Sequence, residues 1–94
     1  MLLDLNFKFK GLDGTDDPNA ELPIAKYVAN ILANGKSNDP IKIRQIAIKL
    51  YNDNCVDLDK SDLSFIFDLI KKNDILADNA KAQILEVILP LLSK

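Results

Sequence analysis

The feature that most constrains this chain is a strict alternation of apolar and polar residues near its start. The apolar positions are Leu3, Leu5, Phe7 and Phe9, and a polar or charged residue follows each of them. A period of two places the four apolar side chains on one face of an extended segment. We therefore predict a β-strand over residues 3–9. Because a lone strand leaves half of its backbone groups unpaired, these four residues also mark a candidate strand-edge interface.

Three partners are open to the predicted strand. Two glycines, Gly11 and Gly14, flank a turn-forming aspartate, so the chain reverses there and residues 15–17 can return as a short second strand. Residues 55–58 are the second candidate. The third is the same strand of another subunit, and the sequence does not choose among them.

Pairing with residues 55–58 would place particular side chains in contact. Val56 and Leu58 alternate with Asp57, as the residues of a short strand do. If this segment pairs with residues 3–9, we expect Val56 and Leu58 to lie against Phe7 and Phe9. The pleat would then turn the neighbouring acidic side chains to water.

Two helices are predicted in the middle of the chain. Pro23 suits the first turn of a helix, and apolar residues at helical spacing continue to an Asn-Gly stop at Gly35. The Asp39-Pro40 pair reads as an N-cap followed by the first helical residue, and opens a helix over residues 40–52.

Two more helices are predicted in the last third. The first begins after an N-cap at Asp59 and closes at the Lys-Lys-Asn sequence of residues 71–73. The second is capped by Asp78 or Asn79, and it should end or kink within a turn before Pro90, which lacks a backbone donor. The predicted fold is α+β in a single domain of residues 1–94: an N-terminal strand or short hairpin, joined by a strand at 55–58 if that segment pairs, packed on a bundle of about four helices.

The amino-acid composition excludes most of the common sets of catalytic residues. The chain has no histidine and one cysteine, Cys55, so it lacks Ser-His-Asp and Cys-His pairs and ordinary transition-metal ligand sets. We expect no enzyme, no cofactor and no small-molecule substrate. The longest apolar run, residues 87–92, is far shorter than the roughly 20 residues of a membrane-spanning helix, and the start of the chain is unlike a signal peptide. A cytoplasmic protein is expected.

Two acidic stretches, residues 13–21 and 53–62, raise the question of a cation site. With Asp57 as the first position of a calcium loop, the sixth position is Asp62 instead of glycine and the twelfth is Asp68 instead of glutamate. Helix capping and solvation explain these acids better, although the sequence does not settle whether either stretch binds a cation.

The middle of the chain is basic. Residues 23–52 hold five bases against one acid, whereas the segments on either side each have a net charge of −3. The helix at 40–52 carries the candidate partner or nucleic-acid surface, which consists of Lys42, Arg44, Gln45 and Lys49. A solvated basic face is the simpler interpretation, because the overall charge is −2 and the first residues after the cap do not read bases.

Three segments together resemble short proteins encoded by bacteriophages and prophages: LNFKFKGLDG (5–14), VDLDKSDLSFI (56–66) and AKAQILEVI (80–88). That resemblance implies a binding or assembly role and supplies no catalytic residues. The leading hypothesis is a non-enzymatic interaction or assembly module of a phage, a prophage or another mobile element that binds a protein partner. A second copy of the chain, in a homodimer, is one candidate for that partner. The alternative is a small DNA-binding regulator that uses the basic helix.

Overall fold

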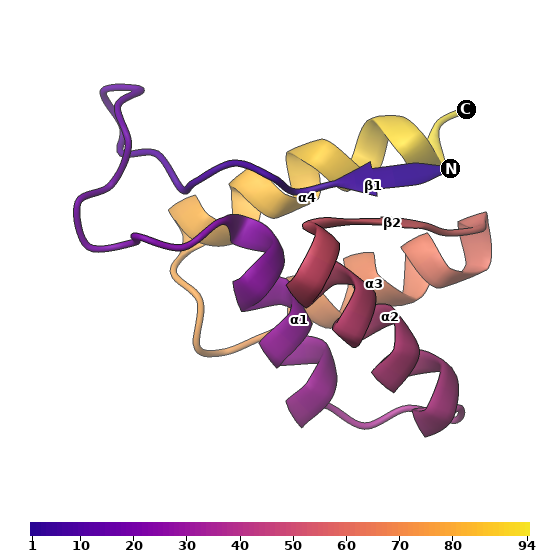
Figure 1. The fold of residues 1–94 in the computed structure, drawn as a ribbon. Coiled ribbons are helices and arrows are strands. Elements are labelled where there is room, and N and C mark those ends of the chain that lie inside the picture. The colour runs from indigo at the N-terminus through magenta and orange to yellow at the C-terminus, as the bar shows by residue number, and fades with distance from the viewer.

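Two short strands and four helices make up the computed structural model, which describes residues 1–94. In chain order they are β1 (Leu2–Asp4), α1 (Ile24–Asn34), α2 (Pro40–Asp53), β2 (Cys55–Asp57), α3 (Lys60–Lys72) and α4 (Asp78–Leu92). Figure 1 shows the strands side by side, and a long loop between β1 and α1 that projects beyond the helices. The predicted α+β fold is confirmed.

The strand at the start of the chain pairs with the segment after α2. β1 and β2 are antiparallel, and Leu3 lies opposite Val56. The Leu58 N–H donates to the Met1 carbonyl oxygen at 2.8 Å, and the Leu5 N–H donates to the Asn54 carbonyl oxygen at 3.0 Å. The second of the three candidate partners is therefore used, in a different register from the expected one. Val56 faces Leu3, so the expectation that residues 56 and 58 lie against Phe7 and Phe9 is wrong.

A single strand over residues 3–9 is also wrong, because the backbone changes partner along its length. Past β1, the carbonyl oxygens of Leu5 and Phe7 accept hydrogen bonds from the first N–H groups of α1, at 3.2 and 2.8 Å. These N–H groups have no partner within the helix, and Pro23, at the N-cap position, supplies no side-chain oxygen. The backbone of the extended segment thus caps α1. Pro23 occupies the N-cap position, whereas the sequence predicted it in the first turn of the helix.

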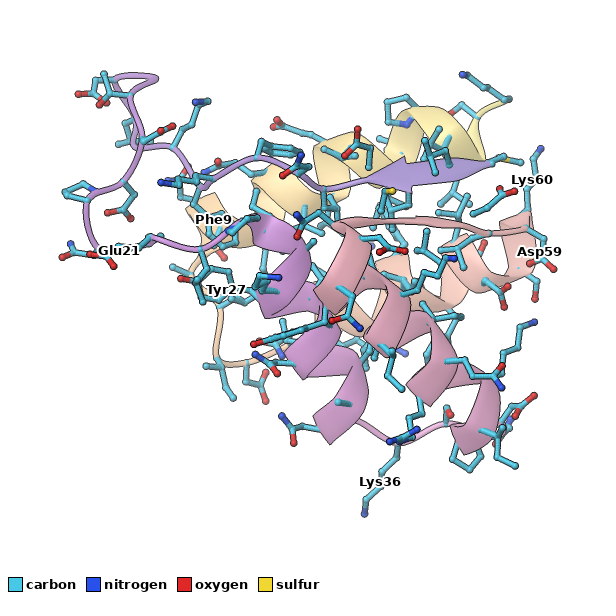
Figure 2. The ribbon with its side chains drawn as sticks, viewed as in Figure 1. Phe9, Glu21, Tyr27, Lys36, Asp59 and Lys60 are labelled. Carbon is cyan, nitrogen blue, oxygen red and sulfur yellow. The ribbon has the colours of Figure 1, made fainter.

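The alternation nevertheless predicted the buried face. Leu3 and Leu5 are fully buried, Phe9 is 6% exposed, and Phe7 is half-buried against the core. Figure 2 shows Phe9 beside Tyr27 of α1, and their ring centroids are 5.3 Å apart. In an extended backbone, alternate side chains point to the same side whichever segment the backbone bonds to. The apolar side chains therefore stay on the buried side although the hydrogen-bond partner changes along the segment.

Residues 9–17, hereafter the hairpin, form a hydrogen-bonded reversal after this segment. The Asp17 N–H donates to the Phe9 carbonyl oxygen at 2.9 Å, and the Gly11 N–H donates to the Thr15 carbonyl oxygen at 2.8 Å. Gly14 has a φ of 84°, a left-handed conformation that glycine adopts without steric cost. The predicted turn and return are confirmed, so this part of the strand also has a partner within the chain.

The helices surround one apolar core to which every element contributes. α1 packs mainly against α2, and α3 against α4. Eighteen residues are buried and none of them is polar or charged. From α2 the core takes Ile46, Ala47 and Leu50. The opposite side of α2 therefore remains at the surface.

The N-caps of α2 and α3 agree with the sequence, whereas both ends of α4 differ from the prediction. Asp39 and Asp59 accept hydrogen bonds from the N–H groups three residues on, as predicted N-caps do. α4 starts after Ala77 without a side-chain cap, and it continues through Pro90 to Leu92. The predicted end of the helix before Pro90 is therefore wrong. Pro90 is exposed, so water can satisfy the carbonyl group that loses its helical donor.

Candidate functional site

The acidic residues around β2 have separate structural partners. Asp57 accepts a hydrogen bond from the N-terminal ammonium group at 2.8 Å, and this contact lowers the pKa of its carboxyl group. The Asp62 N–H donates to the Asp59 side chain at 2.8 Å, which lowers the pKa of Asp59. Asp53 lies 3.7 Å from the Lys49 ammonium group. The structure has no group of three or more residues of the types that ligate metals placed to hold an ion.

The predicted basic surface does not form one face. Lys42, Gln45 and Lys49 lie at helical spacing on the side of α2 that faces β2, where they line a shallow hollow with Asp57 and Asp62. Arg44 is two residues from Lys42, so at about 100° per residue it lies on nearly the opposite side of α2. The structure therefore brings three of the four residues together and separates the only guanidinium group.

Both lysines of this surface form ion pairs with nearby carboxylates. The Lys42 ammonium group lies 2.9 Å from an Asp62 oxygen, and this hydrogen bond raises the pKa of Lys42. Lys49 pairs with Asp53 within the same helix. Arg44, in contrast, forms no ion pair and is exposed.

The candidate strand-edge residues are mostly core residues. Leu3, Leu5 and Phe9 are buried and Phe7 is half-buried, so their side chains contribute little to an outer surface. The exposed apolar side chain on β1 is Leu2, which is 57% accessible. Any interface at this strand would use its backbone edge.

A groove between α1 and α2 is the most apolar hollow on the molecule. It has a volume of about 230 Å³, and its lining includes Ala29, Ala33, Arg44, Ala47, Ile48 and Tyr51. Two asparagine side chains, Asn30 and Asn52, complete its rim. The small alanine side chains leave space between the two helices, and Arg44 places an unpaired cation at the edge of that space.

A lysine organises one end of this groove. The Lys26 ammonium group lies 4.4 Å from the centroid of the Tyr51 ring, within the range of a cation–π contact. It also donates a hydrogen bond to the Tyr51 carbonyl oxygen, which belongs to the last turn of α2, where the helix dipole favours positive charge. This end of the groove therefore combines an exposed aromatic ring with a positive charge.

An exposed apolar stripe on α2 extends the groove. Ile41, Ile48 and Tyr51 are 73%, 43% and 47% exposed, and with Arg44 they follow the spacing that places residues on one side of a helix. The sequence did contain this signal. In helix 40–52 the apolar residues 43, 46, 47 and 50 already account for the buried face, so residues 41, 48 and 51 form a second apolar row that the core does not use.

Sequence reasoning also missed two residues of α4 that hold the base of the hairpin. The Lys10 N–H donates to the Gln83 side-chain oxygen at 2.8 Å, and the Gln83 amide nitrogen donates to the Lys10 carbonyl oxygen at 2.8 Å. The Asn79 amide nitrogen donates to the same carbonyl oxygen at 3.1 Å. A side-chain amide thus bonds to both backbone groups of Lys10, as a neighbouring strand would.

None of the family models, curated proteins or solved structures with which the chain was compared matches it. The resemblance to phage-encoded proteins therefore stays a prediction. No helix in the structure has both the length and the apolar character of a membrane span.

Proposed function

We propose that this protein is a non-enzymatic interaction module that binds an acidic, amphipathic segment of a protein partner in the groove between α1 and α2. The observation that carries the proposal is the combination of an apolar groove with the exposed apolar side chains Ile41, Ile48 and Tyr51 on one side of α2. The resemblance to phage-encoded proteins adds support for a role in assembly.

The chemistry of the groove sets the kind of partner. Apolar contacts with Ile48, Tyr51 and the alanine floor favour an apolar side chain that enters between the helices. Arg44 in the groove and Lys26 against the Tyr51 ring both lack carboxylate partners. An acidic group on the incoming segment would pair with them, whereas a basic segment would be repelled.

Backbone amide shifts of isotopically labelled protein test this proposal. The probe is a synthetic helical peptide of about four turns with leucine on one face and glutamate on the other. We expect shifts centred on Ile41, Arg44, Ile48 and Tyr51. A matched peptide with lysine in place of glutamate should bind at least about tenfold more weakly, because it lacks the charge contact and adds repulsion.

Duplex DNA at low salt is the comparison for the DNA-binding alternative, because electrostatic attraction to phosphate is strongest there. On the proposal, DNA leaves the amides of Lys42, Gln45 and Lys49 unchanged. Equal binding of the acidic and basic peptides, or shifts caused by DNA but by neither peptide, would contradict the proposed function.

A further inference from the structure

We propose that the acidic, apolar segment that enters the groove is supplied by a second copy of this chain, whose hairpin inserts Leu12 between α1 and α2. This inference rests on the proposed function and names the partner for the same groove. The donor and the acceptor are both present in one chain, on different parts of its surface.

The hairpin presents Leu12 as an isolated apolar tip. Leu12 is 96% exposed, and one exposed leucine is ordinary by itself. Its setting is less ordinary, because the turn that carries it is held by several hydrogen bonds. The Gly14 N–H donates to the Gly11 carbonyl oxygen at 3.1 Å, and the Asp13 carboxylate accepts from the Thr15 N–H at 3.0 Å and from the Thr15 hydroxyl at 2.8 Å. A preformed tip loses little conformational freedom when it docks.

The base of the hairpin is fixed as well. The side chains of Gln83 and Asn79 bond to the backbone of Lys10, and the Lys10 ammonium group lies 2.8 Å from an Asp16 oxygen. Figure 1 shows that the hairpin projects away from the helices, so its tip does not lie over the α1–α2 groove of the same molecule. Its apolar tip is therefore free to meet another copy.

Charge complementarity links the hairpin to the groove. Residues 11–22 contain four acids and no base. Apart from Asp16, these acids have no cationic partner, and Figure 2 shows Glu21 on the outer side of the loop. Arg44 lines the groove, and Lys26 contacts the ring of Tyr51, which also lines it. Neither cation has a carboxylate partner. Insertion of Leu12 would bring the acidic loop toward these two cations.

The proposed contact is heterologous, because the donor hairpin and the acceptor groove are different surfaces. Each added copy then leaves one hairpin and one groove free until a ring closes. This property separates the proposal from a symmetric dimer through the backbone edge of β1. It also allows a mixing test: a variant that lacks the donor tip and a variant that lacks the acceptor groove should bind each other, although neither associates with itself.

Sedimentation of the full chain tests the proposal at concentrations up to about 1 mM, since a contact of this size is expected to be weak. We expect the mean mass to rise above the 10.5 kDa of one chain with increasing concentration. Leu12→Ser removes the donor and Ile48→Asp blocks the acceptor. Each variant alone should need at least about tenfold higher concentration to associate. Ile75→Ser, which alters a side chain 91% exposed in another loop, should behave like the unaltered protein.

The decisive measurement is the equimolar mixture of Leu12→Ser and Ile48→Asp. The first variant keeps a groove and the second keeps a hairpin, so we expect one-to-one complexes from two chains that are monomeric alone. Circular dichroism verifies that both variants fold. A mixture that stays monomeric, or a Leu12→Ser chain that associates like the unaltered protein, overturns the inference. If the unaltered chain is monomeric throughout but its groove binds the acidic peptide, this inference fails and the proposed function stands. If the peptide does not bind either, both fail.

Discussion

Replacement of Gln83 by leucine should loosen the base of the hairpin from α4. In the structure the Gln83 side chain exchanges two hydrogen bonds with the backbone of Lys10, both at 2.8 Å. Leucine has nearly the same size and a helix propensity close to that of glutamine, but it can neither donate nor accept. The Lys10 carbonyl oxygen keeps its bond from Asn79, whereas the Lys10 N–H loses its partner.

The size of the effect follows from these bonds. A hydrogen bond contributes about 0.5–1.5 kcal/mol net to stability. Lys10 is exposed, so water can replace the lost partners and the lower half of that range applies to each bond. We expect Gln83→Leu to reduce the free energy of unfolding by about 1–2 kcal/mol, which corresponds to a fall in Tm of roughly 5–12 °C for a chain of this length.

Urea denaturation measures the free energy, and amide hydrogen exchange at Lys10 locates the change. Glu86→Leu is the matched control, because it introduces the same side chain three residues later in α4 at an exposed position without hydrogen bonds or ion pairs. If the two variants lose the same stability, or if exchange at Lys10 is unchanged in Gln83→Leu, the proposed coupling between hairpin and α4 is refuted.

Three further predictions concern the core, one cap and pH. Leu50→Ala removes a fully buried side chain of α2 and should lower the free energy of unfolding by about 2–5 kcal/mol in urea denaturation. Asp59→Ala removes the side-chain cap of α3 and should cost about 1 kcal/mol by the same measurement, whereas Ser61→Ala, in the first turn of that helix, should cost less. The pKa values of Asp13, Asp57 and Asp59 lie below their ordinary 3.8 in the folded state. Their stabilisation is therefore present above pH 3.8 and lost as pH falls through the folded values. Urea denaturation from about pH 6 to about pH 2 should show this loss, with a smaller slope in Asp59→Ala; a slope equal to that of the unaltered chain would contradict the assignment.

The sequence was informative where structure depends on local interactions. The period of two identified the buried face of residues 3–9, and the Asp-Pro pair at 39–40 identified the start of α2, because both patterns act over a few neighbouring residues. The pairing of β1 with β2 joins residues more than 50 positions apart, and nothing in either segment specifies the register. Leu5 and Phe7 show the consequence, since their carbonyl groups bond to α1 and end the strand early.

Pro90 shows a second limit. A proline normally interrupts a helix because it lacks an N–H group and its ring crowds the preceding turn. In α4 only two helical residues follow Pro90, and the side that loses its hydrogen bond faces water. Leu91 and Leu92 are half-buried against the core, so packing favours continuation of the helix. Propensity alone does not register this contribution from tertiary structure.

Charge on a helix does not by itself identify what the helix binds. Exposed ion pairs contribute only about 0–1 kcal/mol, so the pairing of Lys42 and Lys49 with aspartates is weak evidence against DNA, because phosphates could replace the carboxylates. The direction of Arg44 carries more weight. The planar guanidinium group of arginine is well suited to bidentate contact with guanine. Arg44 lies with Ile48 and Tyr51 at the groove, away from Lys42 and Lys49. A cation among apolar side chains suits a protein segment with one acidic and one apolar group, and residues 12–13 supply such a pair within this same chain.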